Sequence, residues 1–132
     1  MILLDTDVMI DVLRAYPPAI AWLDSLGDEV IVLPGFVIME LIQGCKTKRE
    51  VEILRKKLAS FKVLWPATEV CNEALDIFAM HHMSHQTGII DVLVGQLAVS
   101  SQLPLHTFNK KHYLPISGLQ TIQPYQKEDG KS

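Results

Sequence analysis

The sequence is poor in cysteine, and this excludes two common ways of stabilising a small protein. Its 132 residues include only two cysteines, Cys45 and Cys71, which are far apart and form no Cys-x-x-Cys pair. Neither a disulfide framework nor a structural zinc site is therefore expected. The length suffices for one hydrophobic core but not for two, so we expect one compact domain.

Long hydrophobic runs and a basic N-terminus are also missing. The longest apolar run, 88–99, contains Asp91 and is shorter than the roughly 18 to 20 residues that a membrane span needs. The first residues carry aspartates instead of the lysines or arginines of a secretory leader. We therefore expect no contact with a membrane and a cytoplasmic location.

There is no excess of positive charge. Twelve basic and fifteen acidic residues give a net charge of −3, which argues against a protein that coats nucleic acid through bulk electrostatics. A nucleic-acid substrate is still compatible with this charge, because metal ions can bring positive charge to an acidic pocket. Seven of the twelve basic residues lie in 46–62. Such a run forms either a solvated helix face, the commoner case, or a phosphate-contacting surface.

Short apolar runs of strand length alternate with segments of helical spacing. Strands are expected at 2–4, 30–33, 61–64, 105–108 and 119–122. Helices are expected from Val8 to Leu13 and at 18–26, 36–45, 48–59, 68–83 and 88–101. In the helix over 68–83 the inward positions should include Val70, Leu75, Phe78 and Ala79.

This alternation predicts right-handed crossovers between parallel strands. The expected fold is a three-layer α/β/α domain with a central, mainly parallel sheet of four to five short strands. We expect this domain to occupy residues 1–122, and the polar segment 123–132 to be a flexible tail.

Two carboxylates stand where the first strand ends. Asp5 and Asp7 follow the apolar run Ile2 to Leu4, and the carboxyl ends of parallel strands are where such sheets bind ligands. Either aspartate could simply cap the following helix. Two anionic groups so close together repel, however, and a hard divalent cation with oxygen ligands would offset that repulsion.

Two further acids lie on expected helices. Glu40 is on the polar face of the helix over 36–45 and says little by itself. Asp91 lies in the first turn of the most hydrophobic helix, where burial costs several kcal/mol without a partner. That partner is either a ligand of the site or the helix N-terminus itself. Its face also carries residues that are mostly small and should leave open space beside the carboxylate: Thr87, Val94, Gly95 and Ala98.

Four segments in this order resemble a known family. They are Leu-Asp-Thr-Asp at 4–7, Phe-Val-Ile-Met-Glu-Leu at 36–41, Ile-Ile-Asp-Val-Leu-Val-Gly at 89–95, and Thr107-x-Asn109-x-x-His112-Tyr113. Together they look like a PIN-domain nuclease, and the length and order resemble the VapC toxins of toxin–antitoxin pairs. The resemblance extends to Ile122.

The resemblance implies a site for Mg²⁺ or Mn²⁺ that hydrolyses RNA phosphodiester bonds with a metal-activated water, leaving 5′-phosphate and 3′-hydroxyl ends. Asp5 and Asp91 match the principal metal-binding aspartates, Glu40 the third acid, and Asn109 the fourth position. Either Glu40 or Asp91 would orient or deprotonate the water. Supporting polar positions are matched by Thr6, Asp7 and Thr107. The resemblance also implies a homodimer and a VapB-like antitoxin whose tail fills the acidic groove.

Asn109 departs from the pattern of many relatives, which have aspartate there. The loss of one negative charge should weaken a second metal ion unless Asp7 compensates. Lys110, Lys111 and His112 follow directly and could contact RNA, or could be ordinary solvated loop residues. Chain order and parallel strands should bring Asp5 and Asn109 to the same sheet edge.

Three other interpretations remain open on sequence grounds. His81 and His85 have the i, i+4 spacing of zinc ligands, but neither the motif glutamate nor a third ligand lies nearby in sequence; His82 adjoins them. The Asp5-Thr-Asp7 start superficially fits a haloacid-type phosphatase. A non-catalytic binding module with the same fold is the third. The early helices also carry apolar residues that fit either a partner surface or the core: Met9, Val12, Leu13, Ile20, Trp22, Leu23, Ile38 and Ile42.

Overall fold

A computed structural model of the chain, which describes residues 1–127, contains one five-stranded parallel sheet. The strands are β1 (Ile2–Leu4), β2 (Ile31–Pro34), β3 (Lys62–Leu64), β4 (Leu105–His106) and β5 (Thr121–Ile122), and their order in the sheet is β3-β2-β1-β4-β5. All neighbouring pairs are parallel. The predicted α/β class and the parallel sheet are confirmed.

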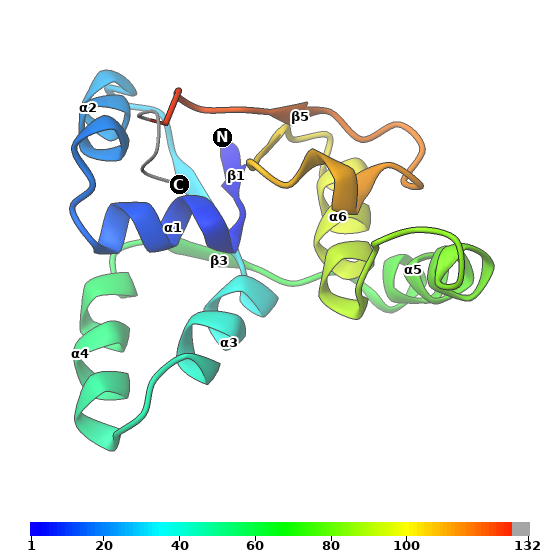
Figure 1. The fold of residues 1–132 in the computed structure, drawn as a ribbon, viewed down its shortest axis with the longest axis horizontal. Helices are drawn as coiled ribbons and strands as arrows, with labels where there is room; N and C mark the ends of the chain where they lie inside the picture. Colours follow the sequence, from blue (N-terminus) through cyan, green and yellow to red (C-terminus); the bar gives the residue numbers. More distant parts are fainter. Residues whose placement is uncertain (128–132) are drawn as a thin grey trace.

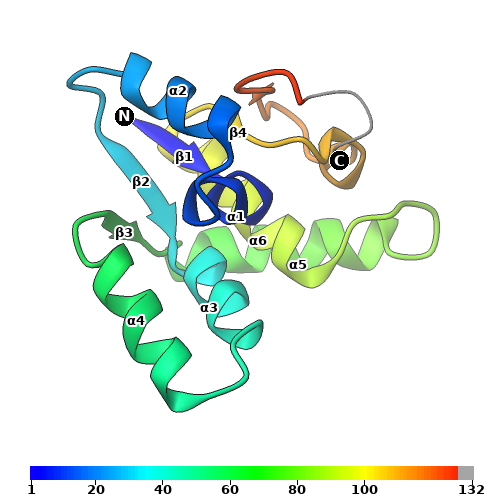
Figure 2. The same ribbon diagram turned by 60° about the vertical axis from the view of Figure 1, so that its left-hand side comes forward.

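The helices lie between the strands, as the alternation predicted. They are α1 (Thr6–Leu13), α2 (Pro17–Ser25), α3 (Gly35–Gln43), α4 (Lys48–Leu58), α5 (Thr68–His81) and α6 (Ile89–Ser101), with a 3₁₀ helix η1 (Lys110–Tyr113) before β5. The chain moves outward from β1 to β3 and then returns past β1 to β4. Right-handed crossovers therefore place α1 to α4 on one face and α5 and α6 on the other, which gives three layers (Figures 1 and 2).

The core lies on both faces of the central strands. Leu3, Leu33 and Leu105 are fully buried in neighbouring strands, and the helices add Met9 and Val94. Because the parallel sheet is covered on both faces, its central strands are continuously apolar instead of alternating. Leu3 pairs with Val32 on one side and with Leu105 on the other, so β1 lies at the centre of the sheet.

Two of the inward positions predicted for α5 are wrong. Ala79 is exposed and Leu75 is 63% exposed, whereas Ala74, next to Leu75, is buried. The helix α5 packs closely on α6, and a small side chain at position 74 allows this close approach. The prediction therefore placed the larger residue, Leu75, on the inward face of α5, whereas the packing places the smaller Ala74 there.

The apolar residues of the early helices are buried or half-buried. Met9 is fully buried, and none of the other seven is among the large hydrophobic side chains that are exposed. Large exposed apolar side chains in the described residues lie elsewhere, for example at Met39, Met80 and Ile89. Within residues 1–127, no helix combines the length and apolar content that a membrane span requires.

The segment after β5 turns back onto the first helices. The Tyr125 hydroxyl donates to Asp11 Oδ2 at 2.7 Å, and Lys127 Nζ lies 3.2 Å from the same oxygen. The Tyr125 ring packs against Tyr16, Trp22 and Phe108. The flexibility expected for 123–132 stays a prediction, and its last five residues, 128–132, lie outside the described residues.

Candidate active site

Asp5 is the buried centre of a group of polar side chains at the carboxyl end of β1. It is 6% exposed and stands at the N-cap of α1, where Oδ1 accepts the N–H of Thr6 at 2.8 Å. Its other oxygen, Oδ2, accepts the hydroxyls of Thr107 and Tyr113, each at 2.8 Å. The sequence offered helix capping and membership of the acidic site as alternatives for this aspartate, and Asp5 does both.

Asp7 lies two residues after Asp5, in the first turn of α1, and connects the site to the segment that follows β4. Its Oδ2 accepts the backbone N–H of Phe108 at 2.8 Å, and Oδ1 accepts that of Val8 at 2.8 Å. Burial, reinforced by the negative charge of Asp5, raises the pKa of Asp7 from 3.8 to about 6. Asp7 therefore bears a penalty for ionisation that a nearby positive charge would relieve.

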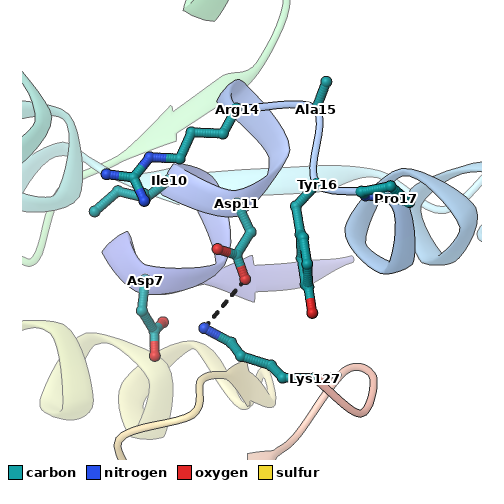
Figure 3. Close-up of a pocket in the computed structure, with 8 residues that line it drawn as sticks. All are labelled: Asp7, Ile10, Asp11, Arg14, Ala15, Tyr16, Pro17 and Lys127. Atoms are coloured by element: carbon teal, nitrogen blue, oxygen red, sulfur yellow. Dashed lines mark ion pairs between the residues drawn. The ribbon is translucent and has the colours of Figure 1, made fainter. Parts of the chain in front are cut away.

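A cavity of about 450 Å³ opens beside Asp7. Its walls come from α1, from Tyr16 and Pro17, and from Lys127 of the C-terminal segment (Figure 3). Figure 3 shows Asp11 directed toward Lys127. The positive charge of Lys127 opposes part of the rise in the pKa of Asp7.

Glu40 comes from the middle of α3. Val37 and Leu41 of this helix are buried, and Glu40 is half-buried, with Oε1 accepting the Thr6 hydroxyl at 2.6 Å. Thr6 thus connects the two acidic residues, since its backbone N–H binds Asp5 and its side chain binds Glu40. Glu40 was predicted to lie on the polar face of its helix, and its side chain is half-buried and hydrogen-bonded to α1.

Asp91 enters from the first turn of α6. Its Oδ2 accepts the N–H of Gly88 at 2.8 Å and lies 3.6 Å from His112 Nδ1. Burial is the main cause that raises the pKa of Asp91, and the negative charges of Asp5 and Glu40 raise it further. The fold therefore brings Asp5 at the N-cap of α1, Glu40 of α3 and Asp91 of α6 within electrostatic range of one another.

The fourth predicted position contacts the site through its backbone. The Asn109 N–H donates to Thr107 Oγ1 at 3.0 Å, while its side chain is exposed and makes no hydrogen bond to the acids within the described part of the chain. Lys110 and Lys111 are exposed and line, with Asn109 and His112, a cavity of about 520 Å³. Thr107 is 3% exposed and links Asp5, Asp7 and Asn109.

Sequence reasoning missed the part that Tyr113 plays. It appeared there only as the last letter of a motif, yet its side chain is 3% exposed and its hydroxyl contacts Asp5. One turn along α6 from Asp91, Tyr113 and Ile116 fill the room that Gly95 leaves, while the open space expected beside the Asp91 carboxylate itself stays a prediction. Tyr113 is the last residue of the short helix η1, and one residue in so short an element gives no periodicity in the sequence from which its contact could be predicted.

The histidine cluster lies away from these acids, at the end of α5. The rings of His81 and His85 are 5.0 Å apart, His82 packs on Phe78, and His85 Nδ1 lies 2.9 Å from the Ser84 hydroxyl. Across residues 1–127, no three histidine, cysteine, aspartate or glutamate side chains are close enough to form a ready-made cation site. No lysine within residues 1–127 forms an ion pair with Asp5.

The donor set of the acidic site nevertheless fits a hard cation. Asp5, Glu40 and Asp91 offer carboxylate oxygens only, and within the described chain no lysine or arginine forms an ion pair with them. Like charges raise the pKa of both Asp7 and Asp91. Each carboxylate is held by hydroxyl or N–H donors that leave other lone pairs free, and Mg²⁺ and Mn²⁺ prefer such oxygen ligands.

The fold and the site together define a three-layer α/β domain with an acidic centre at the carboxyl edge of its sheet. The model of one family, the PIN domain, matches residues 2–114. The chain therefore belongs to the PIN domain family. It is 38% identical over 116 residues to Ribonuclease VapC10 of Mycobacterium tuberculosis, with 86% of each chain covered.

Solved structures agree with this fold. A VapBC-1 structure from nontypeable Haemophilus influenzae aligns with a TM-score of 0.76 at 23% identity, covering 94% of this chain and 98% of that one. A toxin–antitoxin complex from Klebsiella pneumoniae aligns with a TM-score of 0.74 at 20% identity, covering 96% and 100%. The predicted PIN-like architecture is confirmed.

Proposed function

We propose that this protein is a divalent-metal-dependent endoribonuclease and the toxin of a VapBC-type toxin–antitoxin pair. The observation that carries the proposal is the convergence of Asp5, Glu40 and Asp91 at one sheet edge, with a relative of 38% identity that is named a ribonuclease. RNA as the substrate fits a cytoplasmic location.

Asp5 and Asp91 would hold the ion, Mg²⁺ or Mn²⁺, with Glu40 as the third acid. When bound, the ion would supply positive charge to the scissile phosphodiester and lower the pKa of a water molecule. Because Asn109 adds no charge, one ion should bind much more tightly than a second. Calorimetric titration with Mn²⁺ should give one tight site, and two sites of similar affinity would contradict the role given to Asn109.

The chain's own groups divide the remaining work. Thr6 holds Oε1 of Glu40, so that Oε2 is free to orient the attacking water or to accept its proton. Asp91 is the other candidate for this proton. Thr107 ties Asp5 and Asp7 to β4. Lys110, Lys111 and His112 border the site and would contact the RNA backbone, which positions the substrate without reading its sequence.

A cleavage assay tests the proposal. The purified protein is incubated with a mixed pool of structured RNAs in Mg²⁺, Mn²⁺ or EDTA, beside the variants Asp5→Asn and Asp91→Asn. We expect metal-dependent cleavage that falls at least a hundredfold in each variant, because loss of ligand charge weakens both metal binding and charge stabilisation. Asp24→Asn, at an exposed position of α2, is the matched control. Equal metal-dependent cleavage by Asp5→Asn and the native chain would contradict the proposal, and no cleavage by the native chain would contradict it in favour of a binding module.

A groove beside the site suits an antitoxin segment. It has a volume of about 460 Å³ and lies between α1, α3 and α4, with apolar walls that include Ile10 and Leu13. Glu40 and Glu50 also line it, with Arg14 as the one basic residue among the described residues of its lining. The excess of acidic over basic side chains would match an apolar segment with a basic side chain. Leu13→Glu should abolish co-purification with a VapB-like antitoxin, and retention of the partner would exclude this groove.

The homodimer implied by the family needs an apolar face. Met39, Ile42 and Ile90 line a hollow between α3 and the start of α6, with Glu40 and Gln43 at the same hollow, and Met39 is 55% exposed. An exposed apolar hollow of this kind is typical of a subunit contact. Light scattering should show a dimer that Met39→Glu converts to a monomer; an unchanged mass would exclude this face.

A further inference from the structure

Tyr113 is held against Asp5 by the packing of its ring. Its Cδ1 atom would lie 3.2 Å from a Cβ added at Gly95, and Ile116 would lie still closer to that position. A glycine inside a helix costs roughly 0.5 to 1 kcal/mol of stability relative to alanine. In α6 this cost is offset by the packing of Tyr113 and Ile116 against Gly95. The space at Gly95 allows η1 to approach α6 closely enough for the Tyr113 hydroxyl to reach Asp5.

The short helix η1 also places two neighbouring residues on two different acids. His112 Nδ1 lies 3.6 Å from Asp91 Oδ2, and the Tyr113 hydroxyl lies 2.8 Å from Asp5 Oδ2. These aspartates come from distant parts of the chain, in β1–α1 and in α6. The helix η1 therefore contacts both of the principal carboxylates at once.

The hydroxyl of Tyr113 acts on one particular oxygen. Asp5 Oδ2 accepts two hydroxyl donors, whereas Oδ1 accepts only one backbone N–H. A carboxylate oxygen has two lone pairs in its plane, so Oδ2 is saturated and Oδ1 keeps one lone pair for a cation. The side chain cannot rotate without breaking these bonds, and at 3% exposure for Tyr113 no water replaces its hydroxyl.

We propose that Tyr113 is a positioning residue that fixes the orientation of Asp5 and presents a single oxygen, Oδ1, to the divalent cation. This role rests on the proposed function, because it requires that Asp5 bind a metal ion. Partners of this kind, which orient a ligand without touching the ion, typically change metal affinity or activity by 10- to 100-fold when they are removed.

The variant Tyr113→Phe isolates the hydroxyl, because the ring that packs on Gly95 and Ile116 is kept. Calorimetric titration with Mn²⁺ should show affinity about tenfold weaker than in the native chain. Cleavage of RNA should lose kcat at saturating RNA, with KM for RNA unchanged, because Tyr113 is buried and does not contact substrate. Tyr113→4-aminophenylalanine restores an N–H donor and should recover most of the Mn²⁺ affinity.

Tyr125→Phe is the matched control. Its hydroxyl also donates to an aspartate, at 2.7 Å, but to Asp11, outside the group of acids that would bind metal. This variant should lose some thermal stability and keep the native Mn²⁺ affinity. The comparison therefore separates loss of any tyrosine–aspartate hydrogen bond from loss of the one that orients Asp5.

The possible outcomes distinguish this proposal from the proposed function. If the native protein binds Mn²⁺ and Tyr113→Phe binds it equally well, the positioning role is overturned and the nuclease proposal stands. If Tyr113→Phe binds Mn²⁺ more weakly but Tyr113→4-aminophenylalanine does not recover the affinity, the effect is structural and the positioning role is also overturned. If the native protein binds no Mn²⁺, the proposed function fails and the positioning role fails with it.

Discussion

At the scale of single residues, the acidic site is a set of carboxylates, each held by donors of the chain itself. Thr6, Thr107 and Tyr113 supply hydroxyls to Glu40 and Asp5. Hydrogen bonds to a charged group are worth more than those between neutral groups, about 1.5 to 3 kcal/mol each. They offset part of the repulsion among the acids and leave the rest to be relieved by a cation.

Asp7 provides a test of that remaining repulsion. Its pKa is raised from 3.8 to about 6, so the folded state retains a proton that the unfolded chain has already lost between those pH values. The contribution of Asp7 to stability is therefore largest below pH 4 and declines until about pH 6. His106 has a lowered pKa through burial and changes stability in the opposite direction.

The effect of Asp7 can be separated from that of His106 by comparing the native chain with Asp7→Asn at two pH values. We expect the melting temperature of the metal-free native chain, minus that of Asp7→Asn, to fall between pH 4.5 and pH 7.5. Thermal unfolding followed by circular dichroism at both pH values measures it, and His106 cancels because both proteins contain it. A difference that stays constant or rises with pH would show that Asp7 is not destabilised by burial.

At the scale of the elements, α6 and η1 determine how the site is assembled. The helix α6 supplies Asp91 in its first turn and Gly95 one turn later, on the face that receives Tyr113 and Ile116 from the segment around η1. The close contact between α6 and η1 thus links the position of one aspartate to that of the other.

Gly95→Ala should disturb this contact. The added methyl would overlap Ile116 and crowd Tyr113, and overpacking of this kind costs about 1 to 3 kcal/mol. Chemical denaturation measures the loss of unfolding free energy. Gly44→Ala is the control, because its Cβ would meet only two backbone carbonyl oxygens, at 3.5 and 3.9 Å, which are ordinary contacts. Equal effects of the two substitutions would contradict the proposed packing role of Gly95.

At the scale of the whole molecule, the C-terminal segment closes the structure over its first two helices. Tyr125 packs among Tyr16, Trp22 and Phe108, and Lys127 lies 4.5 Å above the ring of Phe108 while pairing with Asp11. These contacts connect the edge of the sheet beyond β5 to α1, which begins at the acidic site.

Loss of this segment should therefore destabilise the whole domain. Tyr125→Ala removes a ring contact and a hydrogen bond, and we expect it to lower the free energy of unfolding by about 2 kcal/mol. Urea denaturation is the measurement, with Gln126→Ala as the control because Gln126 is exposed. A change below 0.5 kcal/mol for Tyr125→Ala, roughly what a neutral surface site gives, would show that the segment contributes little.

Much of the fold and of the acidic set could be predicted from the sequence. Short apolar strands alternating with helices determine a parallel sheet, and chain order then brings the residues after β1 and β4 together. Tyr113, Gly95 and Tyr125 could not be predicted in their roles, because their contacts join segments far apart in the chain and depend on three-dimensional packing. Leu75 was misplaced for the same reason, since periodicity gives the face of a helix more reliably than the depth of each side chain.

The chemistry of the cleaved ends tests the nuclease proposal most directly. The resemblance to PIN-domain nucleases implies water attack with the 3′-oxygen as leaving group, which leaves 5′-phosphate and 3′-hydroxyl ends, whereas attack by the RNA's own 2′-hydroxyl would leave a 5′-hydroxyl and a cyclic phosphate. Products of a defined RNA can be assigned by mass spectrometry after cleavage in Mg²⁺ or Mn²⁺. We predict 5′-phosphate ends that are absent in EDTA and with Asp5→Asn. Cyclic phosphate ends, or cleavage that persists in EDTA, would contradict the proposed mechanism.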